Sequence, residues 1–130
     1  MVVDTMVLAY TLLGVEEYKQ QAWQALASAE SLEAPDSLKA ELTNVVWQWI
    51  MYRRVPLQLG QEVLTDSLGL IDRYVPVENC WQVALELAVS SGHSAYDTLF
   101  IATAELLDTS CMTADQKLHK VFPQHTILIA

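Results

Sequence analysis

The sequence has few cysteines, few basic residues and no long apolar run, and each shortage excludes a class of protein. Its 130 residues include two cysteines, Cys80 and Cys111, which lie in apolar patterns and lack metal-ligand spacing. They predict reduced, buried thiols in a cytoplasmic protein. No apolar run approaches the roughly 18 residues that span a bilayer, so no membrane association is expected. The N-terminus carries Asp4 and no basic residue, unlike a signal peptide.

Positive charge is also scarce, because seven basic residues stand against sixteen acidic ones and the net charge is −9. Such a chain has no broad electrostatic footprint for nucleic acid. If it acts on a polyanion, a bound divalent cation or a basic partner must offset the repulsion locally. The hydrophobic content of 52% argues against disorder and for a sizeable buried core.

Hydrophobic periodicity predicts helices alternating with strands. We expect helices at 16–29, 37–54, 57–70, 78–92, 94–107 and 114–122, and strands at 2–8, 71–77, 109–112 and 125–130, with a further short strand within 32–37. Such alternation predicts an α/β fold in which helices cover both faces of a parallel sheet. No repeat or linker interrupts the pattern, so residues 1–130 are expected to form one domain.

Two aspartates are predicted at the carboxyl ends of strands, the edge where open α/β sheets bind ligands. Asp4 lies among the apolar residues of the first strand, and Asp115 follows the strand near residue 111. Each also has a local alternative. Asp4 could bond only to backbone N–H groups, and Thr113 to Gln116 has the spacing of a helix capping box.

Two further acids border the inward faces of helices. Glu41 lies beside the apolar stripe of its helix, with Asn44 one turn on, and Asp97 aligns with the apolar Phe100. A charge that faces a core is costly unless it is paired or bound to metal. The alternatives are a rim glutamate whose stem covers apolar surface and, because Ser94 precedes Asp97 by three residues, a simple helix cap.

Together, the four acids predict a metal site. Carboxylates gathered at one rim of a sheet repel one another, which raises their pKa values unless a cation is present. Ligation by oxygen alone suits Mg²⁺ or Mn²⁺ rather than zinc. His93 is interpreted as a loop residue and His119 and His125 as surface residues, so no histidine adds zinc spacing.

Each acid lies in a short segment, and the four segments read VVDTMVL, LKAELTNVVW, SAYDTLFIATAELL and CMTADQKL. In this order and spacing they resemble the PIN-domain ribonucleases, most closely the VapC-like toxins of type II toxin–antitoxin pairs. The resemblance implies a three-layer α/β/α sandwich around a mostly parallel sheet of four to five strands. It also implies an endoribonuclease dependent on Mg²⁺ or Mn²⁺, with Asp4, Glu41, Asp97 and Asp115 as its catalytic, metal-binding acids.

The same resemblance assigns supporting roles to Thr113 and Asn44. It makes RNA the substrate, with Lys39 among the few cations near an acid in the sequence. One departure is Met6, which stands where relatives often carry Asn or Ser, so a polar contact near the metal is expected to be missing.

A partner surface is predicted from residues 45–52, which are apolar nearly all the way round a helix. Trp49 falls on the inner stripe, whereas Trp47 and Met51 fall on the other side. Such a helix is either buried on all sides or meets a partner. The resemblance implies a homodimer and a cognate antitoxin, with Trp47 and Met51 as partner-binding residues.

Two other functions are alternatives to the nuclease. Aspartyl-phosphate phosphatases need a second Asp two residues after the first, where Met6 stands. A PIN fold kept as a protein- or RNA-binding module, with weak or no catalysis, stays open because of Met6 and the scarcity of basic residues.

Overall fold

The structure is a computed structural model that describes residues 1–13 and 16–129, and within them lies a five-stranded sheet. All its neighbouring strands pair in parallel, in the order β3-β2-β1-β4-β5. The sheet confirms the predicted α/β class. The strands are β1 (Val2–Val3), β2 (Glu33–Pro35), β3 (Arg73–Val75), β4 (Cys111–Thr113) and β5 (Thr126–Leu128).

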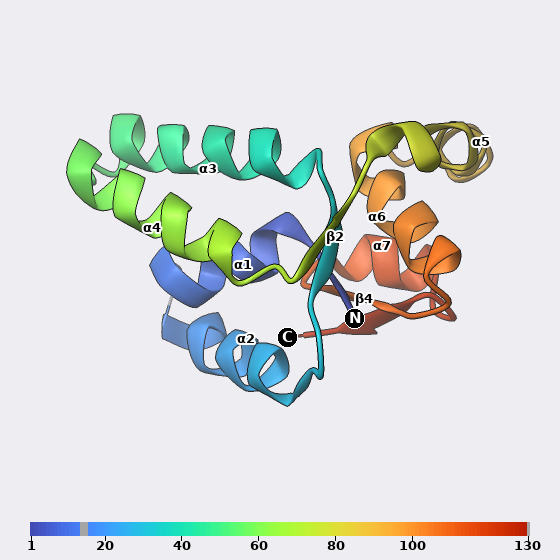
Figure 1. Ribbon diagram of the computed structural model, residues 1–130, viewed down its shortest axis with the longest axis horizontal. Helices are drawn as coiled ribbons and strands as arrows, with labels where there is room; N and C mark the ends of the chain where they lie inside the picture. The colour runs from blue at the N-terminus through green and yellow to red at the C-terminus, as the bar shows by residue number, and fades with distance from the viewer. Residues whose placement is uncertain (14–15, 130) are drawn as a thin grey trace.

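Helices flank this sheet (Figure 1). They are α1 (Thr5–Leu13), α2 (Glu16–Ser28), α3 (Leu38–Tyr52), α4 (Leu57–Gly69), α5 (Trp81–Ser91), α6 (Ala95–Leu106) and α7 (Gln116–Val121), with a short 3-10 helix at Val77–Asn79. Helix α6 packs across β2, β1 and β4, whereas α1 packs against α2, α3 and α4 and also touches β4. None of the described helices is long and apolar enough to cross a bilayer.

The strand predicted at 2–8 is wrong beyond its first residues. Strand β1 ends at Val3, and α1 begins at Thr5 because the Asp4 carbonyl accepts hydrogen bonds from the amides of Val7 and Leu8, at 3.1 and 3.4 Å. The helix is buried on several sides, so its sequence carries no clear amphipathic period. Periodicity alone does not separate such a helix from a buried strand.

The position of α6 is determined by its neighbours on two sides. Gly92 ends α5 with φ of 78°, a left-handed conformation that favours glycine, and turns the chain toward α6. The Thr98 hydroxyl then donates a 2.7 Å hydrogen bond to the Ala84 carbonyl of α5. Phe100 is fully buried. The Thr98 hydrogen bond therefore ties the first turn of α6 to α5, while the helix packs across the sheet.

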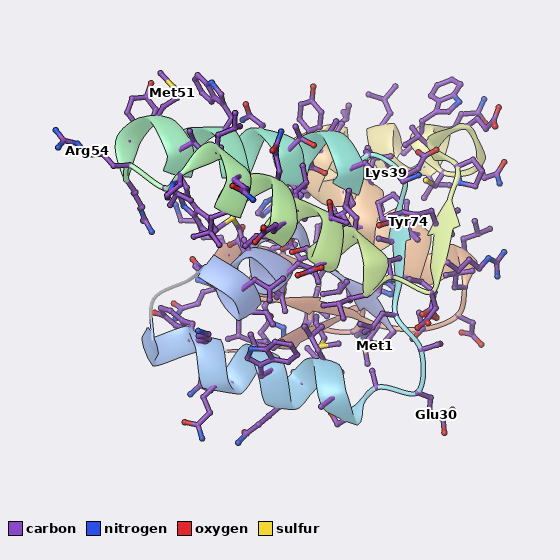
Figure 2. The ribbon with its side chains drawn as sticks, turned by 60° about the vertical axis from the view of Figure 1, so that its left-hand side comes forward. Met1, Glu30, Lys39, Met51, Arg54 and Tyr74 are labelled. Atoms are coloured by element: carbon purple, nitrogen blue, oxygen red, sulfur yellow. The ribbon has the colours of Figure 1, made fainter. Side chains whose placement is uncertain are left out.

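Helix α3 is buried on one side only. Leu42 and Trp49 face the core, whereas Trp47 and Met51 are 48% and 58% exposed. Met51 and Arg54 project together at the end of the α3–α4 hairpin (Figure 2). In the single chain, the helix formed by residues 45–52 is thus not buried on all sides. The partner surface stays a prediction.

Candidate active site at the carboxyl ends of the first and fourth strands

Asp4 and Thr113, two of the predicted site residues, meet at the point of the sheet where the order of the strands reverses. From the central strand β1 the chain builds β2 and β3 on one side of the sheet, then β4 and β5 on the other. The carboxyl ends of β1 and β4 form this switch point, which is where open α/β sheets bind ligands. Here the Asp4 amide donates to the Met112 carbonyl at 3.0 Å, and the Thr113 hydroxyl donates to Asp4 Oδ2 at 2.7 Å.

Three of the four predicted acids line one hollow at this edge, whose volume is about 490 Å³. Asp4 comes from the end of β1, Glu41 from α3 and Asp97 from the first turn of α6. We name this hollow the acidic pocket. Its other lining residues are Thr5, Met6, Ala40, Asn44, Val45 and Tyr96.

Asp115 is placed differently, since it is not among the residues that line the acidic pocket. Its Oδ1 caps α7 by accepting from the amides of Lys117 and Leu118 at 2.9 and 3.1 Å. Asp115 itself is thus the N-cap of α7, so the alternative of a capping box from Thr113 to Gln116 is wrong. Its amide also donates to the Thr113 hydroxyl at 3.0 Å, which links it to Asp4 through one side chain.

Asp97 combines the two roles that its sequence position left open. Its amide donates to the Ser94 hydroxyl at 3.3 Å, so Ser94 caps α6. Its carboxylate lines the acidic pocket, with Oδ2 lying 3.9 Å from Nδ1 of the loop residue His93. Capping by Ser94 therefore leaves the carboxylate of Asp97 available to the site.

The electrostatics of the acidic pocket disfavour negative charge. Burial raises the pKa of Asp4 from 3.8 to about 6; the hydrogen bond from Thr113 opposes this shift, and the charge of Asp97 adds to it. Burial raises the pKa of Glu41 from 4.5 to about 7, and the charges of Asp4 and Asp97 add to that shift. A bound cation would remove this penalty.

The donor chemistry of the pocket fits a hard divalent cation. Two buried oxygens of the pocket, Oε2 of Glu41 and Oγ1 of Thr5, have no hydrogen-bond partner in the part of the chain that the structure describes. An unsatisfied buried oxygen is costly. Carboxylate and hydroxyl oxygens suit Mg²⁺ or Mn²⁺. Within residues 1–13 and 16–129, however, no three Asp, Glu, His or Cys side chains are already close enough to hold an ion jointly. The carboxylates would have to draw together around one.

The PIN domain family matches residues 1–122. The chain belongs to the PIN-domain family. It is 28% identical over 128 residues to Ribonuclease VapC3 of Pyrobaculum aerophilum, and the match covers 95% of each chain. The predicted resemblance to PIN-domain and VapC-like proteins is confirmed.

Two solved structures share the PIN fold. PAE2754 of Pyrobaculum aerophilum superposes with a TM-score of 0.68 at 17% identity, over 98% of this chain and 87% of that one. VapBC2 of Rickettsia felis, solved bound to a DNA fragment from its promoter, also gives 0.68, at 16% identity, over 98% and 95%. Both similarities confirm the predicted fold class.

Thr5 is a polar pocket residue of this PIN domain that was not predicted from the sequence. Thr5 lines the acidic pocket and carries one of its two unpaired buried oxygens. In a strand through residues 2–8, Thr5 would point to the face opposite Asp4. Because α1 begins at Thr5, the side chains of Asp4 and Thr5 both line the acidic pocket. A helix predicted from residue 5 would have placed Thr5 among the candidate site residues.

The raised pKa values of this PIN domain predict that, without metal, the acidic pocket destabilises the fold as pH rises. The folded-state pKa values of Asp4 and Glu41, about 6 and about 7, exceed their ordinary values of 3.8 and 4.5. Between those limits the folded state binds more protons than the unfolded state, so these two groups lower the free energy of unfolding as pH increases. Denaturant unfolding in chelator across this range measures the effect.

The control for this pH dependence is the double variant Asp4→Asn, Glu41→Gln, in which neither side chain titrates. Its stability, relative to that of the natural chain, should increase as pH rises through the window. A difference that does not change with pH would contradict the expected titration.

Proposed function

We propose that this chain is a divalent-metal-dependent endoribonuclease and the toxin of a toxin–antitoxin pair. The observation that carries the proposal is the meeting of Asp4, Glu41 and Asp97, from three separate segments, in one hollow at the switch point of a PIN fold. The name of the relative, Ribonuclease VapC3, supports RNA as the substrate.

In this proposal Asp4 and Asp97 would hold Mg²⁺ or Mn²⁺, and Glu41 and Asp115 would complete the acidic site. The bound cation would lower the pKa of water and offset charge on the phosphate. The Thr113 hydroxyl holds Oδ2 of Asp4 in place, and Oδ1 would be the oxygen that binds the cation.

Glu41 would orient the attacking water and accept its proton. Its Oε2 has no hydrogen-bond partner among the described residues, which leaves it free to accept a hydrogen bond from that water. The water oxygen bonds to phosphorus as the bond from phosphorus to the 3′ oxygen breaks. The products are a 5′-phosphate and a 3′-hydroxyl, whose oxygen takes a proton from solvent. Asn44, at the pocket wall, would support the phosphate by hydrogen bonding.

A cognate antitoxin is the proposed protein partner, in the cytoplasm. The similarity to VapBC2 supports it, and Trp47 and Met51 supply an exposed apolar surface for a partner helix. A homodimer could use the same surface. Size-exclusion chromatography of the chain with and without its partner would measure both associations.

A second candidate function is a binding module without catalysis. Met6 places an apolar side chain in the wall of the acidic pocket, and Asp115 is engaged as a helix cap. Both features favour a site that binds metal weakly. Such a module would bind protein or RNA without cleaving it.

Metal removal separates the two candidate functions. We expect the purified chain to cleave a mixed RNA pool in Mn²⁺ or Mg²⁺ and to lose that activity in excess EDTA, because the uncompensated carboxylates would repel the phosphate. Gel analysis of the products, with re-addition of Mn²⁺ as the control, measures this. No cleavage with either ion would favour the binding module.

A further inference from the structure

Thr5 carries a buried hydroxyl that no described group satisfies. The residue is 6% exposed, it lines the acidic pocket, and its Oγ1 has no hydrogen-bond partner among the described residues. A buried hydroxyl without a partner lowers stability, because it has lost its hydrogen bonds with water and gained none within the protein. In the wall of a candidate active site, such a group indicates that its partner reaches it only in another state of the site.

Local contacts within α1 cannot satisfy this hydroxyl. Thr11, also on α1 and fully buried, donates its hydroxyl to the Val7 carbonyl one turn earlier, at 2.8 Å, which is a common bond for a threonine within a helix. Thr5 begins α1, so no helical carbonyl lies one turn before it. A partner for the Thr5 hydroxyl therefore has to come from another element.

The second unpaired oxygen of the acidic pocket belongs to the complementary group. Oε2 of Glu41 is a hydrogen-bond acceptor, is buried, and has no donor among the described residues. Helix α3, which carries Glu41, packs against α1, which begins at Thr5 (Figure 1). A hydroxyl that lacks an acceptor and a carboxylate oxygen that lacks a donor thus come from neighbouring helices and line one pocket.

Two other side chains that line the acidic pocket can donate hydrogen bonds, but neither is buried. Asn44 is exposed on α3, and Tyr96 is 66% exposed at the start of α6. Solvent can satisfy both of these groups, whereas Oγ1 of Thr5 and Oε2 of Glu41 are screened from it. A hydrogen bond between Thr5 and Glu41 would satisfy two buried atoms at once, so it is the pairing that stabilises the pocket most.

Binding of a cation gives these two groups a reason to meet. Within residues 1–13 and 16–129 no three acids are close enough to hold an ion jointly, so ion binding requires Glu41 to approach Asp4. Asp4 and Thr5 are adjacent in the chain, and both line the pocket. The same approach therefore brings the carboxylate of Glu41 nearer to the hydroxyl of Thr5.

We propose that Thr5 is a positioning residue for Glu41: when the carboxylates draw together around a divalent cation, the Thr5 hydroxyl donates a hydrogen bond to Oε2 of Glu41. This inference rests on the proposed metal-dependent function. A carboxylate oxygen can accept two hydrogen bonds, so Oε2 can accept one from Thr5 and one from the attacking water. Thr113 already supports Asp4 in this way, at 2.7 Å. Thr5 gives the equivalent support to Glu41.

The test measures Mn²⁺ binding directly, by electron paramagnetic resonance of the free ion during a titration. Thr5→Val keeps the branched shape of the side chain and removes its hydroxyl, whereas Thr5→Ser keeps the hydroxyl. The matched control is Thr11→Val, which makes the same change on the same helix outside the acidic pocket. Thermal unfolding of each variant in EDTA measures the stability of the metal-free fold.

Thr5→Val should raise the Kd for Mn²⁺ about tenfold, a usual cost of removing a group that orients a metal ligand. Thr5→Ser should restore most of the affinity, and Thr11→Val should leave the Kd unchanged. In EDTA the order of stability should differ. Thr5→Val should be at least as stable as the natural chain because it loses an unpaired hydroxyl, and Thr11→Val should be less stable because it loses a formed hydrogen bond.

A double variant tests whether Thr5 acts through Glu41. In the Glu41→Ala background, Thr5→Val should change the Kd for Mn²⁺ little, because the acceptor of the hydroxyl is already gone. Kinetics with RNA at saturating Mn²⁺ add a second readout. Thr5→Val should lower kcat about tenfold while KM stays close to that of the natural chain, because the hydrogen bond orients the base and does not touch the RNA.

The outcomes separate the role of Thr5 from the metal site itself. If the natural chain binds Mn²⁺ and Thr5→Val matches Thr11→Val in Kd, the role of Thr5 is overturned and the metal site stands. An equal effect of Thr5→Val with and without Glu41 would show that Thr5 acts independently of Glu41, and a Thr5→Val variant less stable than the natural chain in EDTA would show that the hydroxyl is already paired; either result overturns the pairing. If the natural chain binds no Mn²⁺, the proposed metal-dependent function is overturned as well.

Discussion

Asp97→Asn is expected to lower metal-dependent RNA cleavage by about 100-fold or more while leaving the fold intact, since removing a single electrostatic group from an active site commonly costs that much. The carboxylate lines the acidic pocket and forms no close hydrogen bond among the described residues, so its charge is not needed for packing. The amide that Ser94 caps is unchanged by the substitution. Initial rates in Mn²⁺, with circular dichroism as the check on folding, measure the effect.

The matched control is Asp66→Asn, which removes the same charge from the exposed surface of α4, outside the acidic pocket. It should cleave RNA at the natural rate, because net charge then changes equally in both variants. Cleavage by Asp97→Asn at the rate of the Asp66 control would show that Asp97 is not catalytic. The binding module without catalysis would then be the favoured function.

Asp4→Asn should stabilise the metal-free fold and should abolish most of the stabilisation that metal gives the natural chain. Without metal at neutral pH the substitution should stabilise the fold, because burial has raised the pKa of Asp4 to about 6 and the charged form is disfavoured. A pKa raised from 3.8 to about 6 corresponds to a gain of about 3 kcal/mol at neutral pH. The amide oxygen of Asn can still accept the hydrogen bond that Thr113 now donates.

Adding metal should stabilise the natural chain much more than the Asp4→Asn variant. Saturating the natural chain with Mn²⁺ at about a hundred times Kd should stabilise it by about 2.7 kcal/mol, or several degrees in Tm. Asp4→Asn should gain little from the ion because the variant has lost a central ligand. Thermal unfolding with Mn²⁺ and with EDTA measures both increments, and the Asp66 variant again serves as the control.

Two results would contradict this account of Asp4. Equal stabilisation of Asp4→Asn and the natural chain by Mn²⁺ would show that the ion binds elsewhere. A variant less stable than the natural chain in EDTA would show that the Asp4 carboxylate contributes to the fold rather than to a metal site. Because neither measurement depends on turnover, both apply even if no RNA substrate is cleaved.

Much of the architecture was predictable because its signals are local. The alternation of helices and strands, the end of α5 at Gly92 and the cap of α6 at Ser94 all depend on residues close together in the chain. The helix α1 was not predictable in this way, because it is buried on several sides and carries no clear period. Because a strand was predicted where α1 lies, Thr5 was not predicted as a site residue.

The sequence by itself determined which acids stand at strand ends and helix starts, Asp4 and Asp97 among them, because hydrophobic pattern and capping are short-range properties. Only the tertiary structure decided their surroundings. Asp4 receives its hydrogen bond from Thr113, 109 residues away, and Glu41 reaches the same pocket from α3, whereas the side chain of Asp115 caps α7. Contacts between distant segments depend on how the sheet orders its strands, and that order sets burial, pKa and the shape of the pocket.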